Sequence, residues 1–172
     1  ATKIDDIQKE ADTINPDYLI VDTPGQIELF AYRQSGPFFV NEFIAEEKMN
    51  LFLFDGTMVS TPNNFVSLTL LSTSIRLRLG LPTVNVITKT DLIQEKLEKV
   101  LSWSGTDSQL EADLAGEVNG DTFSLISDML SSLNRHDFQQ DLIPVSNATG
   151  DGMVNLQSAL SRTINLGEEI ED

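Results

Sequence analysis

Residues 22–28 hold side chains that suit chemistry on a phosphorylated ligand. They follow directly after a continuous apolar run, residues 18–21. A carboxylate such as Asp22, placed after a buried strand, can support a Mg²⁺ ion that neutralises phosphate charge. Gly25 lets the backbone approach a phosphate closely and donate its N–H there. The sequence therefore offers a candidate phosphate-side site at the end of its first apolar run.

Gln26 and Glu28 come next and suit the handling of water. Gln26 can orient an attacking water molecule, and Glu28 can accept its proton or hold Gln26 in place. The alternative interpretation is a strand that ends in an ordinary Pro-Gly turn. The Asp-x-x-Gly pattern alone does not distinguish a phosphate-side site from such a turn.

A second polar segment, residues 88–91, follows the apolar run 84–87. The carboxylate of Asp91 can accept hydrogen bonds from both N1–H and the exocyclic amine of guanine. Adenine has an acceptor at N1 and lacks that amine, so it does not fit. The aliphatic stem of Lys89 can cover one face of the base. The alternative is an exposed helix N-terminus with Asp91 as its cap.

The third polar segment, residues 146–152, follows the apolar run 142–145. A loop at this place can close over a base, and a backbone N–H can meet the carbonyl oxygen of the base. Ser146, Asn147 and Ala148 are the candidates for that role. Taken alone, the segment is equally an ordinary Gly-rich turn between a strand and a helix.

Four apolar runs must position these residues: 18–21, 51–54, 84–87 and 142–145. Short continuous apolar runs are typical of strands buried on both faces of a parallel sheet. Asp55 ends the second run and either lines the site or caps a turn. Because ligands bind beyond the carboxyl ends of the strands in open α/β sheets, all three polar segments are expected at one edge.

Helical patterns separate the runs, which favours an α/β fold with a mostly parallel sheet. The apolar spacing predicts helices around residues 4–14, 38–46, 62–79, 92–100 and 153–164, with two more between 106 and 133. Pro62 begins the longest of them, Gly80 ends it, and Phe65, Ile75 and Leu79 lie on its inner stripe.

The three polar segments occur in the order found in GTPases, and the chain resembles the GPN-loop GTPase family of the archaeal type. Residues 17–28, with Gln-x-Glu after the glycine, and residues 78–82 carry the resemblance. It implies a P-loop NTPase-like three-layer sandwich, and hydrolysis of GTP to GDP and phosphate with Mg²⁺. It also implies a homodimer in which each Gly-Pro-Asn loop reaches across to its partner.

Three positions depart from that family. Thr88 stands where the family usually has Asn, although Thr is usual there in the related signal-recognition-particle GTPases. Asn147 replaces a common Ala, and Ala148 replaces a common Lys. These changes bear on base specificity, so an ATPase of the same broad class is an alternative.

No G-x-x-x-x-G-K-[ST] occurs in the 172 residues, and neither does Gly-Pro-Asn. Residues 1–172 are therefore expected to be a single partial GTPase domain, its C-terminal two-thirds, without the N-terminal P-loop strand. The isolated chain is expected to be inactive, since its phosphate-cradling loop is missing. The alternative function is that of a non-catalytic interaction module with a degenerate GTPase fold.

The composition excludes several other classes. A net charge of −16, from 27 acidic and 11 basic residues, argues against partners such as nucleic acid or an anionic membrane. The sequence has no cysteine, and its one histidine, His136, lies in a polar stretch interpreted as a surface loop. No apolar run approaches the roughly 20 residues of a membrane span, and no signal peptide is present, so a cytoplasmic protein is expected.

Overall fold

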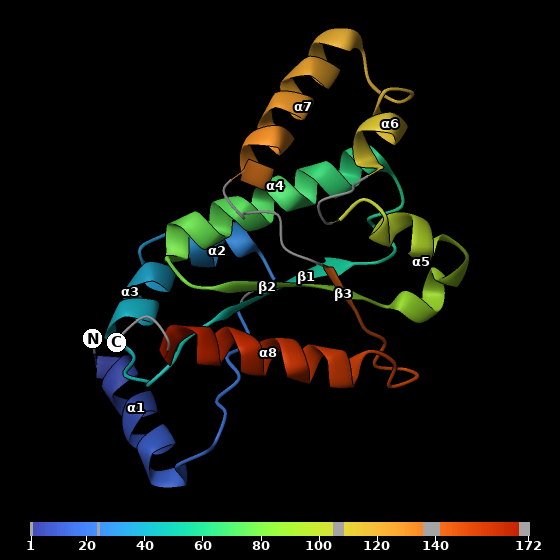
Figure 1. The fold of residues 1–172 in the computed structure, drawn as a ribbon. Coiled ribbons are helices and arrows are strands. Elements are labelled where there is room, and N and C mark those ends of the chain that lie inside the picture. The colour runs from blue at the N-terminus through green and yellow to red at the C-terminus, as the bar shows by residue number, and fades with distance from the viewer. Residues whose placement is uncertain (1, 24, 105–108, 136–141, 169–172) are drawn as a thin grey trace.

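A three-stranded parallel sheet lies at the centre of the computed structural model, which describes residues 2–23, 25–104, 109–135 and 142–168 (Figure 1). The strands are β1 (Asn50–Asp55), β2 (Thr83–Thr88) and β3 (Leu142–Pro144), in the order β1-β2-β3. Three of the four predicted strands are thereby confirmed, and they run parallel as expected.

The central strand β2 is buried along nearly its whole length. Residues 83–87 are all buried, and the strand pairs with β1 on one edge and β3 on the other. The pairing register sets Asp55 opposite Thr88 and Pro144 opposite Ile87. Because parallel strands in register end together, the polar segments that follow them meet at one edge of the sheet.

Helices cover both faces of the sheet, as Figure 1 shows. The larger core cluster lies between one face and the helices around α4, and a smaller cluster lies between the other face and α8. The helices are α1 (Thr2–Ile14), α2 (Ile27–Ala31), α3 (Ser35–Glu42), α4 (Pro62–Leu79), α5 (Gln94–Leu101), α6 (Leu110–Leu114), α7 (Gly120–Arg135) and α8 (Met153–Glu168), with a 3₁₀ turn, η1 (Thr90–Leu92), before α5.

Helix α4 has the bounds that its sequence predicts. Thr61 precedes Pro62 and its side chain accepts from the backbone N–H of Asn64 at 3.3 Å. Gly80 ends the helix in the left-handed conformation with φ 66°, where a residue without a Cβ is favoured. Phe65 and Ile75 are buried in the larger core.

Helix α8 covers β2 and β3 but leaves part of β1 open. Val84 and Val86 of β2 are buried against this side of the molecule. Their register partners on β1, Leu51 and Leu53, are 38% and 60% exposed. The sheet face beneath the α8 layer is therefore only partly covered over β1.

The predicted first strand is wrong. Residues 18–22 have no regular secondary structure, and the apolar side chains of Tyr18, Leu19, Ile20 and Val21 are 47–88% exposed. A strand exists only when another strand pairs with it, and no strand in the described ranges pairs with this segment. The apolar run gave no information about that partner.

The predicted helices are confirmed, including two in the region 106–133. Trp103, interpreted from sequence as packing, is 1% exposed. His136 lies outside the described residues. Within the described ranges, no helix is long and apolar enough to cross a membrane.

Two glycines after β3 allow a matched stability test. Gly150 and Gly152 both have positive φ, 81° and 78°. A Cβ on Gly152 would lie 1.8 Å from the carbonyl oxygen of Pro144, whereas a Cβ on Gly150 would meet nothing within 4 Å. Gly150→Ala should cost about 1–2 kcal/mol from backbone strain. Gly152→Ala should cost a further 1–3 kcal/mol, roughly the range for overpacking.

Urea unfolding of the two variants measures the difference, with Gly150→Ala as the control for strain alone. Equal losses of unfolding free energy would mean that the close approach of Gly152 to β3 does not hold in solution.

Candidate functional site

The carboxyl ends of the three strands bring the second and third polar segments together. Thr88 ends β2, and Lys89, Thr90 and Asp91 turn away from it into η1. Residues 146–152 follow β3 on the neighbouring edge, and the backbone N–H of Thr90 donates to Val145 O at 3.3 Å. Parallel pairing thus joins segments that lie more than fifty residues apart in the sequence.

Asp91 is held by a buried serine. The hydroxyl of Ser146 donates to Oδ1 of Asp91 at 2.6 Å, and Ser146 is 0% exposed. The backbone N–H of Thr149 donates to the Ser146 hydroxyl at 3.3 Å, which directs the serine proton towards the carboxylate. Each carboxylate oxygen has two lone pairs, so both oxygens of Asp91 can still accept from a ligand.

Lys89 is turned towards the neighbouring strand. Its backbone has φ 57°, a left-handed conformation that is uncommon for a residue other than glycine. Its Nζ donates to Oδ2 of Asp55 at 2.6 Å, and the two side chains are 55% and 29% exposed. The ammonium therefore lies at the end of β1, on the opposite side of β2 from Ser146.

Asp55 is itself fixed by the turn that follows β1. Its Oδ1 accepts from the backbone N–H of Thr57 at 2.9 Å and from the Thr57 hydroxyl at 2.7 Å. The hydrogen bond from Lys89, followed by that from the Thr57 side chain, lowers the pKa of Asp55 to about 2. Asp55 thus caps a turn, which confirms one of the two roles considered from sequence, and it also binds Lys89.

Thr88 joins two strands rather than facing a ligand. Its hydroxyl donates to Phe54 O at 3.2 Å, and its carbonyl oxygen accepts from the backbone N–H of Gly56 at 3.0 Å. A Cβ on Gly56 would lie 2.6 Å from that same oxygen, so only glycine allows this approach. Two hydrogen bonds therefore connect Thr88, the residue before Lys89, to the end of β1 and to the loop that follows it.

The remaining predicted residues are less constrained. Asn147 and Ala148 are exposed on the loop after β3. Asp22, Gly25 and Gln26 are exposed before α2, and Glu28 lies within that helix. Among the interactions of the described residues, none joins Asp22, Gly25 or Gln26 to the cluster around Asp91. Of the predicted site residues, the structure thus joins Ser146 to Asp91 by a hydrogen bond and Lys89 to Asp55 by an ion pair.

The metal prediction rested on Asp22 alone. Within the part of the chain that the structure describes, no group of three or more His, Cys, Asp or Glu side chains forms a metal cage. A phosphate-bound Mg²⁺ usually takes one or two protein carboxylates, so the metal role of Asp22 stays a prediction.

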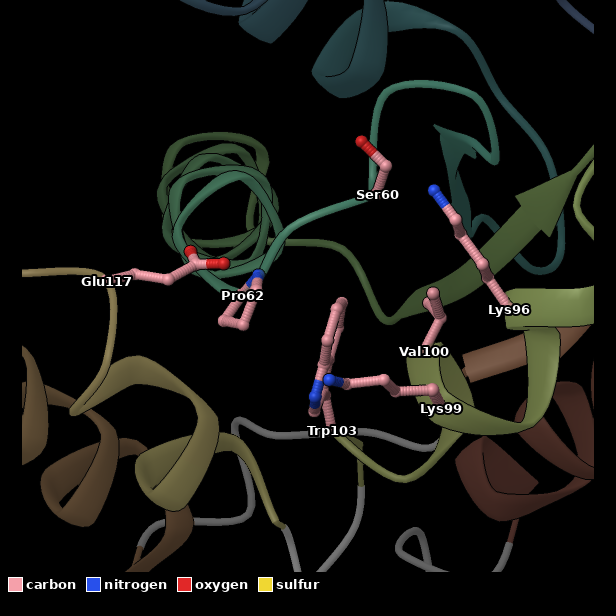
Figure 2. A pocket seen from close by; sticks show the side chains of 7 residues that line it. All are labelled: Ser60, Pro62, Lys96, Lys99, Val100, Trp103 and Glu117. Carbon is pink, nitrogen blue, oxygen red and sulfur yellow. The ribbon is translucent and has the colours of Figure 1, made fainter.

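A separate small pocket lies between the start of α4 and α5. Figure 2 shows it, and its volume is about 180 Å³. The Nε1 of Trp103 donates to Asp113 at 2.7 Å, which is the main cause that holds the pKa of this carboxyl below its usual value. None of the predicted site residues lines this pocket. Its lining residues are Ser60, Pro62, Lys96, Lys99, Val100, Trp103 and Glu117.

Comparison with known proteins gives one family and one fold. Residues 1–166 match a family model described as "Conserved hypothetical ATP binding protein". GPN-loop GTPase QQT2 of Arabidopsis thaliana is 32% identical over 160 residues, 89% of this chain and 40% of the relative. GPN-loop GTPase 1 of Saccharomyces cerevisiae is 27% identical over 95% of this chain and 45% of the relative. The chain thus spans less than half the length of either.

A solved structure shares the fold. The crystal structure of a GTPase in apo form from Pyrococcus abyssi superposes with a TM-score of 0.78 at 22% identity. The match covers 94% of this chain and 65% of that one. The α/β arrangement with a parallel sheet is therefore similar to the fold of a GTPase.

The ion pair between Asp55 and Lys89 should contribute to stability in a pH-dependent manner. The folded pKa of about 2 lies below the ordinary value of 3.8. The contribution is therefore complete above pH 4–5 and is lost as the pH falls towards 2. Because both side chains are partly exposed, solvent screening limits it to about 1 kcal/mol.

Asp55→Asn should accordingly lower the free energy of unfolding by about 1 kcal/mol at pH 7, and by much less near pH 2. Urea unfolding of both proteins across this range measures the gap. A gap that stays constant from pH 7 to pH 2 would contradict the assignment of the low pKa to Asp55.

Proposed function

Since this chain belongs to the family described as conserved hypothetical ATP binding protein and its curated relatives include GPN-loop GTPases, we propose that it forms the base-binding part of a GTP-hydrolysing domain. The observation that carries the proposal is the Asp91 carboxylate, held at 2.6 Å by the buried hydroxyl of Ser146. A carboxylate fixed at a strand end is ready to bind before any ligand arrives.

Guanine and Asp91 are complementary in hydrogen bonding. N1–H and the exocyclic amine both donate, and the two oxygens of the carboxylate accept them as a pair. Adenine presents an acceptor at N1, so its lone pair would face a negative charge. The family description names ATP, and Thr88 departs from the usual Asn, which supports an ATPase as the second candidate. The arrangement at Asp91 favours guanine.

The loop after β3 supplies the other part of the base site. Ser146 is buried and orients Asp91, while Asn147 and Ala148 are exposed, and their backbone N–H groups are the candidate donors. One of these groups would donate to the carbonyl oxygen of guanine. Thr88 contributes indirectly, because its hydroxyl fixes the end of β2 against β1.

Residues 22–28 would serve the phosphates. Mg²⁺ bound with GTP would neutralise charge on the β- and γ-phosphates, and the Asp22 carboxylate would hold it. Gly25 would donate its backbone N–H to the γ-phosphate, Gln26 would orient a water molecule, and Glu28 would accept a proton or hold Gln26. The exposure of Asp22, Gly25 and Gln26 supports these roles, since a ligand can reach them.

We further propose that residues 1–172 act as a single domain and that the homodimer implied by the family resemblance applies to this protein. The continuous core that joins α2, α4, α5, α6 and α7 supports the single domain. The phosphate-cradling loop does not occur in the sequence, so hydrolysis is proposed only for a protein that combines this chain with such a loop.

Nucleotide titration of the 172-residue chain by NMR tests the base site directly. The chain should bind GDP more tightly than ADP, with dissociation constants in the millimolar range, about −4 kcal/mol. Asp91→Asn should reduce the preference for GDP by roughly tenfold or more, since hydrogen bonds to charged groups contribute about 1.5–3 kcal/mol each. Asp113→Asn, which alters a carboxylate next to Trp103, is the control and should leave the preference unchanged.

If the unmodified chain binds GDP and ADP equally, guanine recognition by Asp91 is wrong. If it prefers ADP, the ATPase alternative replaces the proposal.

Turnover tests the roles of Gln26 and Glu28. In a longer protein that contains this chain and a phosphate-binding loop, Gln26→Ala and Glu28→Ala should lower kcat by roughly 10²-fold, as expected for the loss of water activation. GTP affinity should change little, because neither residue is assigned to binding. Gln157→Ala, an exposed glutamine on α8, is the control. Unchanged kcat in both variants would refute the assignment.

A further inference from the structure

The ion pair between Asp55 and Lys89 has no role in the function proposed above. Asp55 is the last residue of β1, and Lys89 follows the last residue of β2. Their side chains meet at 2.6 Å across the strand ends. This distance is shorter than the 3.4 Å that separates Lys99 and Asp113 in a second ion pair.

The pair limits the freedom of a side chain that would otherwise be mobile. A lysine has four rotatable bonds, and a stem that is free to rotate gives no fixed surface for a base. Here the left-handed backbone at Lys89 directs the chain, and Asp55 binds its far end. Asp55 cannot follow the lysine elsewhere, because Thr57 holds its second oxygen with two hydrogen bonds.

The pair also separates charges within one loop. Lys89 and Asp91 are two residues apart and have opposite charges. If the Lys89 ammonium paired with Asp91, it would block the oxygens that are proposed to accept from guanine. Instead, Asp55 draws Lys89 towards β1, and Ser146 draws Asp91 towards β3. The acceptor oxygens of Asp91 therefore stay available.

We propose that Asp55 is a positioning residue of the base site: it holds the Lys89 stem in place as the wall for the base and keeps the ammonium away from Asp91. This inference rests on the proposed recognition of guanine by Asp91, and it assigns to Asp55 no contact with the nucleotide.

A double-mutant cycle read by GDP titration tests the proposal on the 172-residue chain. Asp55→Asn keeps the shape of the side chain and its bond from the Thr57 backbone, but removes the charge that binds Lys89. It should weaken GDP binding by about three- to tenfold, a usual range for the loss of one positioned interaction. Lys89→Met keeps an unbranched apolar stem and removes the ammonium. In that background, Asp55→Asn should have no further effect.

Asp113→Asn is the matched control. It also removes the charge of an aspartate beside a lysine, Lys99, but it lies next to Trp103 and away from the strand ends. It should leave the dissociation constant for GDP unchanged. Amide spectra of each variant report whether the fold is retained. If Asp55→Asn does not fold, Lys89→Met still tests the ion pair, because it removes the charge of the other residue.

The outcomes separate this inference from the proposed function. An equal loss of GDP affinity from Asp55→Asn in the normal and Lys89→Met backgrounds would overturn it, because Asp55 would then act through the turn at Thr57. Unchanged GDP affinity in Asp55→Asn would overturn it as well, while a preference for GDP over ADP in the unmodified chain would leave the proposed function standing. An unmodified chain without that preference would overturn both.

Discussion

Burial of β2 on both faces and pairing along both of its edges is the constraint on which the candidate site depends. A backbone that is fully hydrogen-bonded and packed from both sides cannot slide by one residue without moving every side chain to the wrong face. The register of β2 with β1 and β3 therefore fixes Thr88 beside Asp55, and Ile87 beside Pro144. The strand ends therefore fix where the following loops begin. As a result, Lys89 binds Asp55 and Ser146 binds Asp91 at 2.6 Å, although these pairs are 34 and 55 positions apart in the chain.

The site also illustrates how an acidic protein arranges its few cations. The sequence has 11 basic residues against 27 acidic ones, and two of its lysines, Lys89 and Lys99, form ion pairs with aspartates. Lys89 contacts an aspartate that is already hydrogen-bonded by Thr57, whereas Lys99 contacts one that is hydrogen-bonded by Trp103. In both cases a neutral donor binds one oxygen of the carboxylate and the lysine binds the other.

Local signals in the sequence predicted much of the fold. The bounds of α4 could be predicted because Pro62 favours the start of a helix and Gly80 favours its end, and both effects are local in the sequence. The segment 18–22 could not be assigned in this way, since its apolar run resembles that of β2 and only the presence of a neighbouring strand distinguishes them. Of the candidate site, Asp91 was predictable from its place after an apolar run. Its bond to Ser146 and the bond of Lys89 to Asp55 depend on strand order, and residue spacing does not encode that order.

The left-handed backbone at Lys89 has a consequence for how this position can change. A residue with a Cβ at φ 57° carries about 1–2 kcal/mol of strain, which a glycine would relieve. Glycine would relieve that strain, but it would also remove the ammonium and with it the ion pair to Asp55, which contributes about 1 kcal/mol. The two effects on the free energy of unfolding largely offset each other. A change from lysine to glycine at position 89 would therefore remove the stem and the ammonium with little change in stability.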